Sequence, residues 1–372
     1  MIPVAEPALA GEDIARAIEC LKTGWISSAG AYIDQFERSW AAYCGMPHGV
    51  AVSNGSVALD VAVKLLELEP GDQVIMPSFT IISCAQAIVA CGGIPVLVDS
   101  EPDSWQMDVS QIEAKITPRT KAIMVVHMYG HPADMDPILE ICARHQLTLI
   151  EDAAEVHGAR YKGRVCGSFG DIVTFSFYAN KLITTGEGGM LLLRNEQFAT
   201  RARSLRNLCF QPQRRFLHDE LGNNFRLTNL QAALGIGQVE RIEDIVDRKR
   251  SIAKRYDELL EGVPGIQLHR EQSWAKHVYW TYGLVLDASY GDDCVYVTDL
   301  LKQRGIETRP FFLGMHEQPV FHKMGLFRGE RYPVAENLAR RGFYIPSGLT
   351  LSGSQLEEVA SAVREILKSL AR

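Results

Sequence analysis

Several features that would indicate other functional classes are missing from this sequence. Positive charge is not in excess, because 38 lysines and arginines stand against 45 aspartates and glutamates, giving a net charge of −7. This balance argues against nucleic acid or an anionic membrane surface as a partner. The glycine patterns of dinucleotide-binding and Walker loops are also absent. We therefore expect no nucleic-acid partner. The missing glycine patterns also argue against a dinucleotide or a nucleoside triphosphate as the ligand.

Signals for secretion, disulfide bonding and membrane insertion are missing as well. The eight cysteines are scattered without a C-x-x-C pair, which is typical of buried thiols in a reducing cytoplasm. The first residues show no basic segment followed by an apolar one, so no signal peptide is predicted. The apolar stretch over residues 85–98 is interrupted and too short to cross a bilayer. We expect a cytoplasmic protein without a membrane segment.

What the sequence does contain is an alternation of short β-branched runs and helical patterns. A chain of 372 residues, 47% of them hydrophobic, can bury one large core and form a second, smaller domain. Strands are expected at residues 50–53, 73–76, 95–98, 122–126, 147–150, 172–176 and 190–193. Helices are expected between most of these strands, one of them over residues 109–116. This order predicts an α/β fold with a mostly parallel sheet covered on both faces.

The domain boundary is expected within a long helical pattern. That pattern runs over residues 228–260, with an interruption near residues 241–245. The composition then changes, and the following pattern predicts a strand over 280–286 and helices over 298–304 and 355–370. We therefore predict a large domain over residues 1–245 and a small C-terminal α/β domain over residues 246–372.

Two turns that follow predicted strands contain residues suited to a ligand site, since ligands of open α/β sheets bind beyond the carboxyl ends of strands. In Ser53-Asn54-Gly55-Ser56, glycine allows a close backbone approach, and the helix that begins there favours phosphate. The alternative is an ordinary turn with Ser56 as the helix cap. In the other turn, Asp152 could hold a pyridinium nitrogen protonated or cap the next turn. Glu155 could reach a cofactor oxygen or face solvent.

A third turn contains Ser176 and Lys181 among glycines and threonines. A lysine in a partly desolvated site has a lowered pKa and can form an imine with an aldehyde. Most lysines are solvated surface groups, but the glycine-rich surroundings favour the imine-forming interpretation. No metal site is predicted, because His127 and His131 follow a strand and lack the glutamate of a zinc-protease motif; lining a pocket or a structural role suits them better.

Four segments together resemble the DegT-type sugar aminotransferases, which are fold-type I pyridoxal phosphate (PLP) enzymes of the aspartate aminotransferase superfamily. The segments are Ser53-Asn-Gly-Ser56, Glu151-Asp-Ala-Ala-Glu155, Phe175-Ser-Phe-Tyr-Ala-Asn-Lys181 with its continuation to Gly189, and Gly222-Asn-Asn-Phe-Arg-Leu-Thr228. The resemblance covers nearly the whole chain. It implies a three-layer fold whose large domain contains the mostly parallel sheet, and PLP as the cofactor.

The resemblance also implies a role for each matching residue. Lys181 would be the Schiff-base lysine and the proton-transfer base, Asp152 would pair with the pyridine nitrogen, and Glu155 would lie near O3′. The cofactor phosphate would be bound by Gly55, Ser56, Val57 and Ser176. Asn224 would reach that phosphate from the neighbouring subunit of a homodimer with shared active sites. Substrate-side positions are matched by Trp25, Ile26, Ser27, Arg309 and His316.

Further segments, such as Trp25-Ile-Ser-Ser and Ser104-Trp-Gln-Met, resemble family members that aminate GDP-linked sugars. They imply transfer of an amino group from L-glutamate to C4 of GDP-4-keto-6-deoxymannose, giving GDP-perosamine. A UDP- or dTDP-linked keto sugar or a keto-cyclitol is the alternative acceptor. A PLP-dependent sugar dehydratase carries histidine at the lysine position, so Lys181 argues against it, and also against a non-catalytic regulator.

The sequence departs from the family pattern at two positions. An aromatic residue usually follows Pro-x-x-Thr and stacks on the cofactor ring, but here Ile81 follows Thr80. Ile81 can still pack on the ring, and Phe79 and His127 are alternative covers. Asn223 stands where an aromatic residue is common. These departures bear on the substrate more than on the chemistry.

Overall fold

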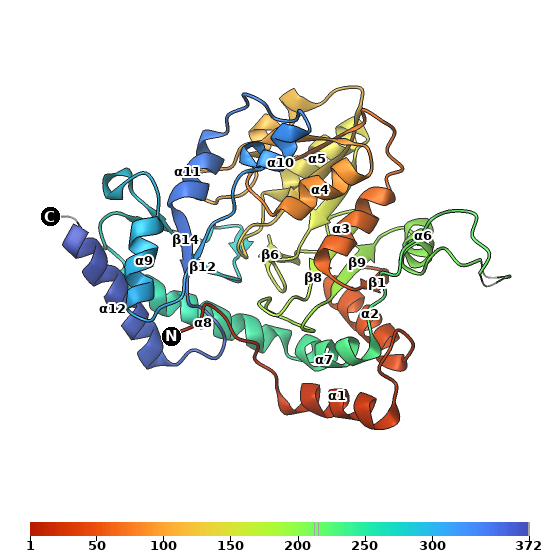
Figure 1. Cartoon of the computed structure of the whole chain (residues 1–372), viewed down its shortest axis with the longest axis horizontal. Coiled ribbons are helices and arrows are strands. Elements are labelled where there is room, and N and C mark those ends of the chain that lie inside the picture. Colours follow the sequence, from red (N-terminus) through yellow and green to blue (C-terminus); the bar gives the residue numbers. More distant parts are fainter. Residues whose placement is uncertain (212, 215, 371–372) are drawn as a thin grey trace.

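The computed structural model describes residues 1–211, 213–214 and 216–370, and its main element is a seven-stranded sheet (Figure 1). The strands lie in the order β1 (His48–Val52), β9 (Gly189–Leu193), β8 (Ile172–Ser176), β5 (Thr148–Asp152), β4 (Thr120–Val126), β2 (Gln73–Pro77) and β3 (Ile94–Val98). Only β9 runs against the others. The strands are almost entirely buried, as expected for a sheet covered on both faces. The predicted mostly parallel sheet is confirmed.

Helices from the N-terminal two thirds of the chain pack around this sheet. They are α1 (Gly11–Thr23), α2 (Ala31–Cys44), α3 (Gly55–Lys64), α4 (Ile82–Ala90), α5 (Met135–His145), α6 (Glu196–Arg206) and α7 (Asn229–Glu240). Helix α3 contacts β8 and β9, α2 contacts β1, and α7 packs against both α1 and α2. Helix α3 therefore places its N-terminus at the ends of the central strands.

The C-terminal elements form a second sheet on one side of the molecule, at the left in Figure 1. Its antiparallel strands are β10 (Ile266–Leu268), β12 (Tyr282–Leu286), β14 (Gly342–Ile345) and β13 (Arg309–Pro310). The helices of this part are α8 (Ile242–Leu260), α9 (Val295–Gln303), α10 (Pro319–Lys323), α11 (Pro333–Arg341) and α12 (Gly353–Leu370). The expected boundary after residue 245 falls within α8, so the division into two domains stays a prediction. A third sheet joins β11 (Ala275–Lys276), β6 (Arg160–Tyr161) and β7 (Arg164–Val165).

The helix expected over residues 109–116 is wrong. Two short 3₁₀ turns, Val109–Gln111 and Glu113–Lys115, occupy this segment. The side chain of Asp108 accepts hydrogen bonds from the Ser110 N–H and the Gln111 side chain, which favours a local turn. Pro118 follows closely, and a helix of this length is marginal without strong packing.

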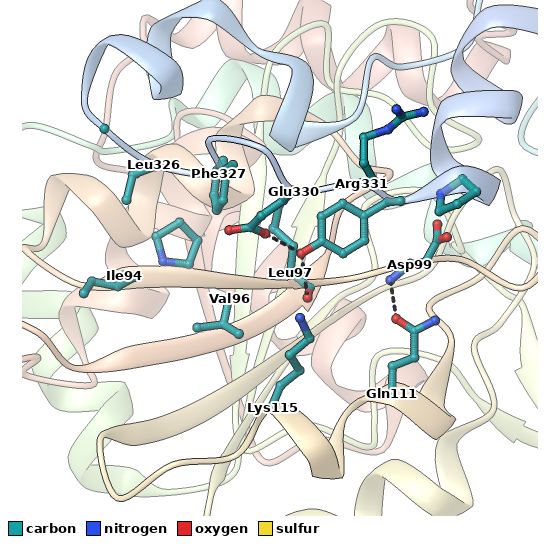
Figure 2. Close-up of a pocket in the computed structure, with 14 residues that line it drawn as sticks. Ile94, Val96, Leu97, Asp99, Gln111, Lys115, Leu326, Phe327, Glu330 and Arg331 are labelled. Atoms are coloured by element: carbon teal, nitrogen blue, oxygen red, sulfur yellow. Dashed lines mark hydrogen bonds between the residues drawn. The ribbon is translucent and has the colours of Figure 1, made fainter.

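Strand β3 forms one outer edge of the main sheet. Ile94 and Val98 bond toward β2, so the alternating residues Pro95 and Leu97 direct their backbone groups outward. Pro95 has no N–H, and the Leu97 carbonyl accepts a hydrogen bond of 3.2 Å from the Tyr332 hydroxyl (Figure 2). A cavity of about 610 Å³ opens at this edge, with Lys115 among its lining residues. None of the predicted site residues lines it.

Candidate active site

A second cavity, of about 510 Å³, brings seven of the predicted site residues together. It lies at the carboxyl ends of β1, β5 and β8, where the sheet topology places the turns that follow these strands. The predicted residues that line it are Gly55, Ser56, Ile81, Asp152, Glu155, Ser176 and Lys181. Val57 belongs to the same first turn of α3 but is not among the lining residues.

One end of the cavity is built by the start of α3. Asn54 caps this helix, because its Oδ1 accepts a hydrogen bond of 2.9 Å from the Val57 N–H. The alternative assignment of Ser56 as the cap is therefore wrong; its hydroxyl lies 2.8 Å from the Ser83 hydroxyl. A Cβ at Gly55 would lie 2.7 Å from the Ser176 Cβ, so only glycine fits there. This helix start can bind an anion.

Asp152 at the end of β5 provides a buried carboxylate. Its Oδ1 accepts hydrogen bonds from the Ala154 N–H at 3.1 Å and the Thr174 hydroxyl at 3.2 Å. Its Oδ2 accepts a thiol contact from Cys84 at 3.5 Å and no other hydrogen bond from the described part of the chain. Burial raises the pKa of Asp152, and these contacts together with Lys181 oppose that rise. A positively charged group at the cavity end of Asp152 would stabilise the ionised carboxylate further.

Lys181 and Glu155 form a nearly buried pair. Lys181 Nζ lies 3.8 Å from Glu155 Oε1, and their side chains are 10% and 7% exposed. Burial lowers the pKa of Lys181, whereas Glu155 and Asp152 raise it. Burial also raises the pKa of Glu155 to about 7, against the charge of Lys181 and the Tyr129 N–H. The alternative in which Glu155 faces solvent is therefore wrong, and Lys181 has the desolvated surroundings of an imine-forming amine.

Trp280 is a cavity residue that the sequence did not reveal. Lys181 Nζ lies 3.5 Å from the centroid of its ring, and its indole N–H donates a hydrogen bond of 2.8 Å to the Asn180 carbonyl. Trp280 comes from the C-terminal part of the chain, about a hundred residues from Lys181, so no local pattern connects the two. Tyr178 and Asn180 also line the cavity. Their position in the sequence, within three residues of Lys181, could have identified them as cavity residues.

Of the residues considered as covers for a cofactor ring, Ile81 and His127 line the cavity and Phe79 does not. Phe79 is buried against Tyr129 and Phe311. His127 lies with Nε2 3.1 Å from Glu151 and accepts the Ala133 N–H at Nδ1. Within the described ranges no cluster of three or more potential metal ligands occurs.

The remaining predicted residues do not line the cavity of their own chain. Trp25, Ile26 and Ser27 are exposed in the loop between α1 and α2, and Asn224 is exposed beside Asn207. Arg309 is exposed and pairs with Glu307 at 2.6 Å. His316 is buried, 2.7 Å from the Ser78 hydroxyl and 3.3 Å from Glu336. Their assignment to substrate, or to a neighbouring subunit, remains a prediction.

The residues of the cavity fit pyridoxal phosphate. The start of α3 suits its phosphate, the Asp152 carboxylate suits its ring nitrogen, and the Lys181 amine suits its aldehyde. All eight cysteines are free thiols, and seven of them are buried as predicted, whereas Cys91 is half-buried. Among the helices of the described residues, none has the length and apolar character needed to cross a bilayer.

Comparison with known proteins places the chain among sugar aminotransferases. The model of the DegT/DnrJ/EryC1/StrS aminotransferase family matches residues 7–364. The GDP-perosamine synthase of Escherichia coli O157:H7 is 40% identical over 364 residues, which is 98% of this chain and 98% of that protein. The GDP-perosamine synthase of Caulobacter vibrioides is 40% identical over 367 residues, with the same coverage of 98% and 98%.

A solved structure agrees with these sequence matches. The aminotransferase TlmJ from Streptoalloteichus hindustanus has a TM-score of 0.93 and 32% sequence identity, with 100% of both chains covered. The expected fold-type I α/β architecture, the PLP cofactor and the activity of a sugar aminotransferase are confirmed. The chain belongs to the DegT/DnrJ/EryC1/StrS aminotransferase family.

Proposed function

We propose that this enzyme transfers an amino group from L-glutamate to C4 of GDP-4-keto-6-deoxymannose and so makes GDP-perosamine, in the cytoplasm, for O-antigen biosynthesis. The observation that supports the chemistry best is the Lys181 amine, desolvated beside Glu155 and Asp152 in a cavity at the strand ends. The two bacterial relatives that are 40% identical over nearly their full length support the GDP-linked acceptor.

We assign the predicted residues to parts of the cofactor. Gly55, Ser56, Val57 and Ser176 bind its phosphate at the start of α3, where the helix dipole and free N–H groups favour an anion. Asp152 would hold the ring nitrogen protonated, Glu155 would lie near O3′, and Ile81 would cover the ring. When bound, PLP supplies an electron sink for the charge that develops at the reacting carbon.

Lys181 moves the proton in both halves of the reaction. With PLP and the amino donor bound, the neutral amine of Lys181 would be the group that accepts the proton from the donor's Cα and later gives it back. The same residue moves a proton in the opposite direction when the sugar is aminated. Burial lowers the pKa of Lys181 and so increases the fraction of amine that is free to accept a proton.

A homodimer with shared active sites is part of this proposal. Asn224 would reach the phosphate of the neighbouring subunit, and Trp25, Ile26, Ser27, Arg309 and His316 would lie on the substrate side. Asn224 and the loop over residues 25–27 are exposed and are not among the residues that line the cavity, which is compatible with this arrangement. His316 fits it least well, because its ring is buried between Ser78 and Glu336.

An acceptor panel tests the substrate assignment. The purified enzyme is given L-glutamate with GDP-, UDP- or dTDP-linked 4-keto-6-deoxy sugars, and 2-oxoglutarate is measured. We expect turnover with GDP-4-keto-6-deoxymannose and a product whose mass is that of GDP-perosamine. Amination of only a UDP- or dTDP-linked sugar, or of a keto-cyclitol, would overturn the GDP assignment but leave the transaminase chemistry intact.

Replacement of the lysine tests the chemistry itself. Lys181→Ala should lose turnover and the visible absorbance of lysine-bound PLP, because no other amine lines the cavity within the described residues. Lys115→Ala, which removes a lysine from the separate cavity at the β3 edge, is the matched control and should keep both. Turnover by Lys181→Ala would show that this assignment is wrong.

A further inference from the structure

The amine of Lys181 lies on an aromatic face that has no role in the chemistry described so far. Its Nζ is 3.5 Å from the centroid of the Trp280 ring, and Trp280 is 5% exposed. The negative face of an indole attracts an ammonium ion at this distance, and the attraction is stronger where water is excluded. A neutral amine gains much less from the same contact. The indole therefore favours the protonated form of Lys181.

Two further contacts fix the indole relative to the lysine. Its N–H donates to the carbonyl of Asn180, the residue directly before Lys181. It also stacks on Tyr129, with ring centroids 6.2 Å apart and planes at 16°, and the Tyr129 N–H donates to Glu155 Oε2 at 2.7 Å. Trp280 therefore contacts the turn that contains Lys181 directly, and it contacts Glu155 through Tyr129.

Glu155 and Trp280 support the ammonium form in different ways. The pKa of Glu155 is raised to about 7, so this acid gains a proton near neutral pH and its attraction for the amine weakens. The indole does not titrate, so its attraction persists over the whole working range. The attraction of Trp280 for the Lys181 ammonium therefore remains after Glu155 has gained a proton and lost its charge.

Trp280 also separates two cavities. Asn180, Lys181 and Trp280 line both the main cavity and a small one of about 20 Å³ behind the lysine turn. The small cavity has room for about one water molecule. A much smaller side chain at position 280 would join the two spaces and let water reach the amine. A test of the indole must therefore keep its volume.

We propose that Trp280 is a positioning residue that holds the ammonium form of Lys181 on its indole face while the lysine is free of the cofactor. The proposal rests on the assigned role of Lys181 as the amine that captures PLP. It follows that the negative charge on the face of this ring, together with burial and the two carboxylates, influences the pH at which Lys181 loses its proton.

Fluorinated tryptophans test this without changing the shape of the site. Full-length protein freed of cofactor carries tryptophan, or its mono-, di- or trifluorinated analogue, at position 280, and its rate of PLP capture is measured against pH. Capture rises as Lys181 loses its proton. Each fluorine weakens the ring's attraction for a cation, so the midpoint should move stepwise to lower pH, by roughly half to one and a half units over the series.

The holoenzyme gives a second measurement and Trp274 gives a control. The acid limb of the kcat profile should move in the same direction as the capture midpoint. The same analogues at Trp274, which packs on His131 and Tyr161, should leave the midpoint unchanged. A midpoint that stays constant across the series at position 280, or that moves equally at Trp274, overturns the proposal.

Lys181→Ala shows whether a negative result rejects only the role of Trp280 or the proposed function as well. If Lys181→Ala still captures PLP at the native rate, the assignment of Lys181 is wrong and the function proposed above fails with it. If Lys181→Ala abolishes capture but fluorination leaves the midpoint unmoved, only the role of Trp280 is rejected.

Discussion

Lys181 Nζ and Glu155 Oε1 lie 3.8 Å apart, both side chains are nearly buried, and each group changes the proton affinity of the other. Desolvation disfavours the charged form of both, whereas their mutual attraction favours it. With the pKa of Glu155 near 7, the pair can hold or release a proton at neutral pH. This is the property that a proton-transfer site needs.

At the residue scale, Asp152 can be tested by removing its charge alone. Asp152→Asn keeps the size of the side chain but cannot stabilise a protonated ring nitrogen, so turnover should fall by about 10²- to 10³-fold. Cofactor content, measured by absorbance, should change much less. Asp136→Asn, which removes an exposed carboxylate paired with Lys162, is the control and should keep native turnover. Unchanged turnover of Asp152→Asn would contradict its assignment.

A second residue-scale prediction concerns Ile81, which lines the cavity and is 38% exposed. An aromatic ring there could stack on the cofactor, and such contacts contribute about 0.5–1.5 kcal/mol. Ile81→Phe should therefore retain PLP up to about ten-fold more tightly during dialysis. Ile81→Leu keeps an aliphatic side chain and should show no gain. Equal retention by the Phe and Leu variants would argue that another residue, such as His127, covers the ring.

The sequence predicts these site residues to different degrees. Asp152, Ser176 and Lys181 lie at or just beyond the ends of strands that β-branched runs identify, so the rule that ligands bind at strand ends finds them. Trp280 was missed because its contact with Lys181 depends on how the C-terminal segment packs. His316 was assigned from its motif alone, and its burial beside Ser78 depends on the same packing.

At the element scale, the start of helix α3 affects both the stability of the fold and the binding of the cofactor, because Asn54 caps the helix next to the predicted phosphate site. Asn54→Ala removes the acceptor of the Val57 N–H, so the free energy of unfolding should fall by about 0.5–2 kcal/mol. Thermal or urea unfolding measures this change. Asn54→Asp keeps a capping oxygen but adds a negative charge near the predicted phosphate, so it should stay stable and yet bind PLP more weakly. Equal effects of the two variants on PLP binding would contradict the phosphate assignment.

The elements themselves were predictable where they are long or buried. The central strands were found because both of their faces are apolar. The expected break near residues 241–245 appears at Arg241, between α7 and α8. Residues 109–116 form only 3₁₀ turns, and two-residue strands such as β13 have too few residues for any periodicity. Those elements are defined by tertiary contacts.

At the scale of the whole molecule, three buried histidines connect segments distant in sequence. His277 Nδ1 accepts the Tyr279 N–H, its Nε2 lies 3.2 Å from His269 Nδ1, and His269 Nε2 bonds the Ser104 carbonyl. His131 accepts the Gln272 N–H at Nε2. These contacts satisfy the neutral rings, so protonation would break them.

The pH dependence of stability follows from this cluster. Burial lowers the pKa of His131 to about 4 and those of His269 and His277 well below 6.5. The folded state thus binds fewer protons than the unfolded state, and stability falls as the pH drops from 6.5 toward 4. His131 alone should contribute roughly 3 kcal/mol to this loss. Urea unfolding at several pH values measures it, and His131→Gln should flatten the slope; an equal slope in both proteins would contradict the prediction.

Hybrid dimers test the shared active site. Lys181→Ala and Asn224→Ala chains are each expected to be poorly active alone. In a mixed dimer, one site would contain both defects and the other neither, so an equal mixture should recover about a quarter of native activity. Two different affinity tags on the two chains, with purification over both in succession, verify that hybrids form. No recovery in verified hybrids would mean that Asn224 acts in its own subunit or not at all.

The closed edge at β3 has a consequence for how the protein behaves at high concentration. An open edge strand is a template on which other chains can add strands and begin a fibril. Here Pro95 has no N–H to donate, and the Leu97 carbonyl already accepts a hydrogen bond from the Tyr332 hydroxyl. Both features disfavour the addition of a strand at this edge, so we expect little aggregation from that side of the main sheet.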